Sequence, residues 1–170
     1  MDQRKAKILA DEGFELIEAE RYDEAESKYL EAMKLIDPDH WSTQDIHGQF
    51  GMLLSKMDKS DEALEQYNLS LQSALRCDSP ESVSVTLARY FLADCYMRHK
   101  KYGEALTSIK PSLEIECENK WLACFVAAQV HYKLEDEETS DHYASQVLFL
   151  APKGKYSSLG ELKDIIREYV

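Results

Sequence analysis

Histidine and cysteine are the residues of this chain best suited to metal binding or nucleophilic catalysis. They are His40, His47, His99, His131 and His142, and Cys77, Cys95, Cys117 and Cys124. His131 follows Cys124 by seven residues and shares a helix face with it, but two ligands do not fix a zinc or copper ion. The chain has none of the glycine-rich phosphate-binding, H-E-x-x-H or G-x-S-x-G motifs of common enzymes. We therefore expect a protein without catalytic residues, bound metal or cofactor.

The cysteine spacing favours reduced thiols. No two cysteines form a C-x-x-C pair, and a cytosolic chain of 170 residues does not need a disulfide framework. A single bridge between Cys117 and Cys124 is the remaining alternative. No apolar leader precedes Asp11 and Glu12, and the longest apolar run, 121–128, is too short to cross a membrane. We expect a cytoplasmic protein.

The charge balance restricts the partners. The chain has 20 basic and 32 acidic side chains, which give a formal charge of −12 at pH 7. A phosphate backbone or an anionic membrane repels such a surface, so we expect neither nucleic acid nor membrane as a partner. Another protein fits better, above all a basic peptide or an amphipathic helix with basic edges.

An internal repeat in the sequence predicts the secondary-structure elements of the chain. Small residues recur twelve positions apart in the pairs Gly13 and Ala25, Gly51 and Ala63, Ala93 and Ala105, and Ala128 and Ser140. Two helix backbones can approach closely where small residues face each other. Polar breaks separate the two members of each pair, at 20–21, 58–59, 100–101 and 135–136. Because these breaks allow only an antiparallel return, the pattern predicts four helical hairpins.

Three of the second helices open with similar residues. They read Arg-Tyr-Asp-Glu-Ala at 21–25, Ser-Asp-Glu-Ala-Leu at 60–64 and Lys-Tyr-Gly-Glu-Ala-Leu at 101–106. With the proline exits at 36–38 and 150–152, this motif resembles the tetratricopeptide repeat (TPR) over about residues 5–152. The resemblance implies an all-α, right-handed superhelical stack of antiparallel helix hairpins, a TPR-like solenoid. Ser140 and Ala144 depart from the motif, so we expect the fourth repeat to be distorted.

We expect one TPR-like domain over 1–170, with repeats near 5–38, 44–77, 86–117 and 121–152 and a capping helix over 156–170. The predicted helices are 3–19, 22–36, 42–57, 60–77, 80–99, 102–116, 119–134, 137–150 and 158–169. The last has an apolar stripe of Leu159, Leu162, Ile165, Ile166 and Tyr169. The repeat spacings of 38, 42 and 35 residues exceed the family period of about 34, and we assign the surplus to longer helices around 39–42 and 77–85. Ser79 is the predicted N-cap of the fifth helix.

The TPR resemblance also implies a concave surface that is lined by the first helix of each hairpin and binds peptides or partner helices. By helical geometry this surface displays Phe14, Ile17, Met52, Leu87, Tyr90, Phe91, Asp94, Met97, Leu122, Phe125, Gln129 and Tyr132. Aromatic and methionine side chains are enriched at interfaces, so we expect these residues to bind a partner protein. Two alternatives stay open: neighbouring helices bury them, or the C-terminal helix fills the groove.

Other functions of such a module also stay open. Family members that bind acidic chaperone tails carry a basic clamp, whereas the matching positions here hold Ala10, Phe14, Met52, Leu87 and Phe91. An acidic tail is therefore an unsuitable partner. The acidic chain is instead compatible with a chaperone or immunity-type neutraliser of a basic effector or toxin. The third alternative is a self-associating scaffold, such as a homodimer.

Overall fold

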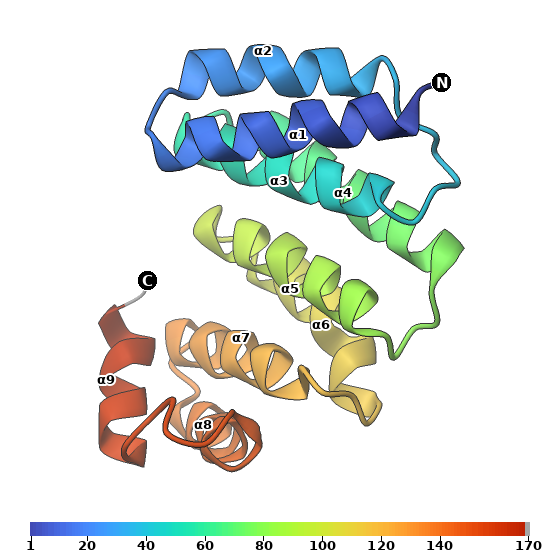
Figure 1. Ribbon diagram of the computed structural model, residues 1–170. Coiled ribbons are helices and arrows are strands. Elements are labelled where there is room, and N and C mark those ends of the chain that lie inside the picture. The colour runs from blue at the N-terminus through green and yellow to red at the C-terminus, as the bar shows by residue number, and fades with distance from the viewer. Residues whose placement is uncertain (169–170) are drawn as a thin grey trace. The chain divides into compact units, whose positions relative to one another are not determined.

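The computed structural model describes residues 1–168 as helices joined by turns and short loops, with no strand in that range (Figure 1). The helices are α1 (Gln3–Glu18), α2 (Tyr22–Met33), α3 (Thr43–Lys56), α4 (Ser60–Cys77), α5 (Val83–Arg98), α6 (Tyr102–Glu114), α7 (Lys120–Lys133), α8 (Glu137–Leu150) and α9 (Leu159–Glu168). The predicted all-α fold is confirmed, and each predicted helix is present. Tyr169, the last member of the predicted apolar stripe, lies outside the described residues.

Helices pair in chain order as the hairpins α1–α2, α3–α4, α5–α6 and α7–α8. The small residues explain the close approach, because Gly13 leaves room only for the ring of Tyr29: an added Cβ would lie 2.9 Å from it. The fourth hairpin uses a hydrogen bond at the same place. Ser140 donates its hydroxyl to the carbonyl oxygen of Ala128 at 2.8 Å, so the departure from alanine ties α8 to α7.

Each hairpin turns through one residue in the left-handed backbone conformation. These residues are Glu20, Asp58, Lys100 and Glu135, with φ angles of 59°, 58°, 59° and 61°. All four lie at the predicted polar breaks. The same strained geometry at four turns indicates four copies of one structural unit, although none of the four residues is a glycine.

The chain divides into two compact units, Met1–Ser79 and Pro80–Val170. The first contains α1 to α4, and its core includes a parallel stack of Tyr29 on Phe50 with ring centroids 5.4 Å apart. The second contains α5 to α9, where Leu162 and Ile166 of α9 are buried against α7 and α8. The single domain expected over 1–170, with its C-terminal capping helix, stays a prediction.

Two expectations about the connections are wrong. The surplus of the first spacing lies in the loop 34–42 and not in a longer helix. The surplus of the second lies in a longer helix as expected, because α4 has 18 residues against 13 in α6, whereas the loops 78–82 and 115–119 are equally long. Pro38 and Pro80 disfavour helical backbone at the residues before them, and Asp78 is extended with φ −129° and ψ 161°. The N-cap of α5 is therefore Ser82, not Ser79: its hydroxyl accepts the Val85 N–H at 3.3 Å.

Candidate functional site

In the first unit, the expected surface consists of side chains from α1 and α3. Phe14 and Met52 are partly exposed and remain available to a partner. Ile17 is buried in the core of the unit. Gln49, beside this surface on α3, accepts a long hydrogen bond of 3.4 Å from the Tyr29 hydroxyl. Only two of the three predicted residues in this unit can therefore contact a partner directly.

In the second unit, α5 is apolar on more than one side. Met97 is buried in a cluster with residues of α6 and α7, so it belongs to the core. Leu87 and Tyr90 are half-buried, and the Tyr90 ring meets Phe91 edge-on at a centroid distance of 5.3 Å. Phe91 itself is 43% exposed. The α5 face thus keeps an aromatic surface, centred on Phe91.

On α7 the expected surface is mostly covered. Phe125 and Gln129 are buried, whereas Leu122 and Tyr132 are partly exposed. The cover comes from the C-terminal part of the chain, because Phe125 packs in one cluster with Leu162 and Ile166 of α9. Phe125 is therefore covered by the C-terminal part of the chain, which is one of the two alternatives stated above. Ile17, Met97 and Gln129 follow the other alternative, because neighbouring elements bury them.

Buried polar atoms that make no hydrogen bond among the described residues lie on α5 and α7. Asp94 of α5 accepts a hydrogen bond from Arg98 Nε at 2.9 Å through Oδ2, while its Oδ1 is buried and unbonded. Burial raises the pKa of Asp94, and the neighbouring Arg98 partly opposes this shift. Both side-chain amide atoms of Gln129 are buried without a hydrogen bond among the described residues. Unsatisfied groups of this kind favour a hydrogen-bonding ligand or an enclosed water.

Sequence reasoning missed one group of residues. Lys155 and Tyr156 follow α8 in the connection to α9, and Lys155 Nζ lies 4.9 Å from the ring centroid of Trp121. The Tyr156 ring is parallel to that of Phe125, with centroids 6.5 Å apart. A Lys-Tyr pair in a glycine-containing loop gives no periodic signal, so helical spacing cannot identify it.

The residues best suited to catalysis are dispersed. Within residues 1–168, no three His, Cys, Asp or Glu side chains lie close enough to hold a metal ion. The four cysteines are free, and burial raises the pKa of Cys95 and of Cys124 to about 11, which favours the unreactive thiol. His131 lies 3.1 Å from Asp136, which also caps α8 by accepting the Thr139 N–H. This Asp136 therefore has a structural role at the fourth turn.

No family model and no curated protein matches the chain. Solved structures with a similar fold include PilF and BtubC. PilF of Pseudomonas aeruginosa is 22% identical with a TM-score of 0.65, and the alignment covers 98% of this chain and 68% of that one. BtubC from P. vanneervenii is 15% identical with a TM-score of 0.76, and the alignment covers 90% and 68%. Both are all-helical TPR-type proteins.

The chain has a tetratricopeptide-repeat fold. The helices α1, α3, α5 and α7 are the first helices of its TPR hairpins, and α9 follows the last of them. No helix within the described residues is long and apolar enough to span a membrane.

Proposed function

We propose that this TPR-fold chain is a non-catalytic interaction module that binds a peptide or helix of another protein. The observation that carries the proposal is the first-helix face of α5. One side of α5 contributes Ala93 and Met97 to the core, and the other carries the partly exposed Leu87 and Phe91. An aromatic side chain on a scaffold of packed helices is a frequent anchor in protein interfaces.

The charge of the chain suggests a basic partner. Asp94 follows Phe91 by three residues, so both side chains lie on neighbouring parts of one helix face. The partly exposed Asp94 carboxylate places a negative charge beside this apolar anchor, which favours a lysine or arginine in the partner. A net charge of −12 also attracts basic segments over long distances.

The proposal is tested by affinity capture from cells of the source organism with three versions of the protein. We expect Phe91→Ala to reduce capture of its partner about tenfold or more, because interface anchors contribute about 2 kcal/mol or more. Phe149→Ala is the matched control, since Phe149 is an 87% exposed phenylalanine on α8. Undiminished capture by a folded Phe91→Ala protein contradicts the α5 surface. Loss with Phe149→Ala alone supports self-association or binding through α8 instead.

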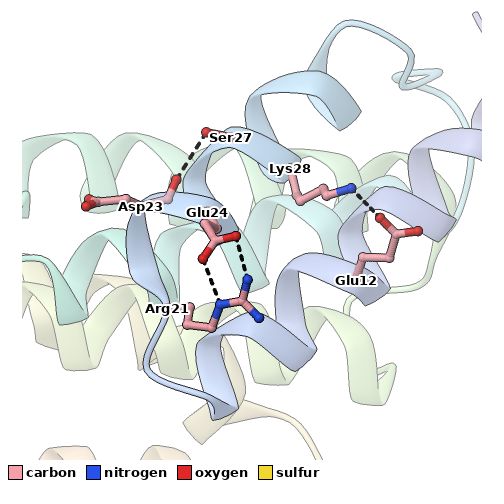
Figure 2. A network of polar contacts seen from close by, with 6 residues as sticks. All are labelled: Glu12, Arg21, Asp23, Glu24, Ser27 and Lys28. Carbon is pink, nitrogen blue, oxygen red and sulfur yellow. Dashed lines mark hydrogen bonds and ion pairs between the residues drawn. The ribbon is translucent and has the colours of Figure 1, made fainter.

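A neutraliser of a basic effector or toxin is the second candidate, and the charge distribution favours it. Residues 1–79 contain nine basic and 18 acidic side chains, a net charge of −9, whereas residues 80–170 have −3. Figure 2 shows two cations near the turn between α1 and α2 that are paired with carboxylates: Arg21 with Glu24, and Lys28 with Glu12 at 2.6 Å. Other acidic side chains of this surface, such as Glu15 and Glu18, are exposed.

The same capture experiment separates the two candidates. Glu15→Lys/Glu18→Lys reverses two exposed charges on α1 and leaves α5 unchanged. A neutraliser that binds through the first unit loses its partner in this variant and keeps it in Phe91→Ala. Binding through α5 gives the opposite result.

A further inference from the structure

The connection between α8 and α9 folds back onto α7. Its residues 151–158 form no helix, and Gly154 has a φ of 82° that lets the chain turn tightly. The Lys155 N–H donates to the carbonyl oxygen of Pro152 at 3.1 Å and closes this turn. The turn brings Lys155 and Tyr156 against α7, the first helix of the fourth hairpin.

Two aromatic residues of α7 receive this segment. Trp121 and Phe125 are four residues apart, so they lie one above the other on the same helix face. The ammonium of Lys155 lies 4.9 Å from the Trp121 ring centroid and 5.9 Å from that of Tyr156. Tyr156 in turn stacks on Phe125 with an angle of 10° between the rings. These distances suit a cation–π contact and an offset aromatic stack.

The segment therefore has the chemistry of a bound peptide. It presents a lysine followed by a tyrosine to an aromatic pair on a first helix of a TPR hairpin. Lys155 is exposed, and Tyr156 is half-buried against the cluster that contains Phe125, Leu162 and Ile166. Ser157, the next residue, donates its N–H to Glu161 Oε2 at 2.6 Å and so ties the chain to the first turn of α9.

We propose that Lys155 and Tyr156 form an internal pseudo-ligand, and that Trp121 and Phe125 form a site for a partner segment in which a basic residue precedes an aromatic one. The proposal rests on the proposed function, whose partner chemistry it specifies. The negative charge of the chain favours such a basic segment over a neutral or acidic one. The partner displaces the chain's own segment when it binds.

A tethered competitor lowers the apparent affinity for a free ligand by the fraction of open sites. Short connections give effective concentrations in the millimolar range, which exceeds those of most free peptides. Removal of the Lys155 and Tyr156 side chains therefore unmasks the site. We expect the affinity for a free basic-aromatic peptide to rise about tenfold or more.

The test uses the full chain and a fluorescent peptide with the sequence of residues 152–158, Pro-Lys-Gly-Lys-Tyr-Ser-Ser. Fluorescence anisotropy measures its binding to the wild type and to Lys155→Ala/Tyr156→Ala. We expect about tenfold tighter binding to the double variant, and no binding of a control peptide with Lys155→Glu and Tyr156→Ser. Equal affinity for wild type and variant overturns the proposal, and so does the absence of binding to both.

A second measurement does not depend on the stability of the double variant. The chain has two tryptophans, so Trp41→Phe leaves Trp121 as the single fluorescent indole. In this background Lys155→Ala shifts the Trp121 emission, whereas Lys153→Ala, in the same loop, leaves it unchanged. An unchanged emission in Lys155→Ala excludes the cation–π contact. Because neither measurement involves α5, a negative result here leaves the Phe91→Ala experiment as an independent test of the proposed function.

Discussion

Gly13 shows how a single missing methyl group sets the distance between α1 and α2. A Cβ at this position would lie 2.9 Å from a ring carbon of Tyr29, a side chain that is fully buried and stacked on Phe50. The ring has no free space to move into. The glycine is therefore required by packing and not by backbone conformation.

We predict that Gly13→Ala destabilises the protein by about 1–3 kcal/mol, the usual cost of an extra methyl group in a filled core. Denaturant unfolding followed by circular dichroism measures the change. Gly103→Ala is the control, because an added Cβ there meets nothing within 4 Å in α6. We expect this control to leave the stability unchanged or raise it by up to about 1 kcal/mol, since alanine favours helix. Equal effects of the two substitutions would show that the Tyr29 contact is unimportant.

Residue spacing identifies a helix face, but it does not identify what covers that face. Spacing correctly places Phe91 at the surface and misplaces Met97, which lies almost two turns further along the same helix and packs against α6 and α7. Phe125 is covered by Tyr156, a residue of an irregular loop. Neither contact has a periodic signal in the sequence, because each depends on a third element that arrives from elsewhere in the chain.

At the scale of the element, helix positions follow from the sequence better than the loops do. The small-residue pairs and polar breaks fix both ends of each hairpin turn, so α2, α4, α6 and α8 begin at or very close to their predicted residues. The surplus spacing carries no such markers. Extra residues fit equally well into helices or loops by length. The first surplus lies in the loop that contains Pro38, which disfavours helical backbone before it, and the second lies in α4, which continues for 18 residues before the loop that contains Pro80.

The four left-handed turns lead to a prediction about stability. Lys100 has a φ of 59°, a conformation that costs a residue with a side chain about 1 kcal/mol and costs glycine almost nothing. We expect Lys100→Gly to stabilise the protein by about 0.5–1 kcal/mol, after allowance for the greater freedom of glycine in the unfolded chain. Thermal and denaturant unfolding report the change.

The control for this prediction is the same substitution inside a helix. Lys110 is exposed on α6, where glycine costs about 1 kcal/mol. Lys110→Gly should therefore lower the stability. A Lys100→Gly protein that is as unstable as Lys110→Gly would mean that the turn does not require its left-handed residue.

At the scale of the whole molecule, charge is divided unequally along the chain. Residues 1–79 have a net charge of −9 and residues 80–170 one of −3, although the two parts are similar in length. Ion pairs at the surface of the first unit, such as Lys28 with Glu12, contribute little to stability. Repulsion among the acidic side chains therefore dominates the electrostatics of the first unit.

This imbalance predicts a different response of the two units to salt. The Debye length falls from about 10 Å at 0.1 M to about 3 Å at 1 M salt, so sodium chloride screens the repulsion between exposed carboxylates. We expect amide hydrogen exchange in residues 1–79 to slow several-fold when the salt concentration is raised from about 0.05 M to about 0.5 M. Exchange in residues 80–170 should slow less, which makes the second unit an internal control for general effects of salt.

A variant with less charge tests the cause. Glu15→Gln/Glu18→Gln removes two exposed carboxylates from α1. It leaves the ion pairs of Lys7 with Asp11 and of Lys28 with Glu12 in place. We expect amide exchange in residues 1–79 of this variant to be slower than in the wild type at low salt, where repulsion is strongest. Added salt should then slow exchange less in the variant than in the wild type. If both units respond equally to salt, or if the variant keeps the full wild-type response, the acidic surface does not destabilise the first unit, and its charge is free to serve partner binding at no cost to folding.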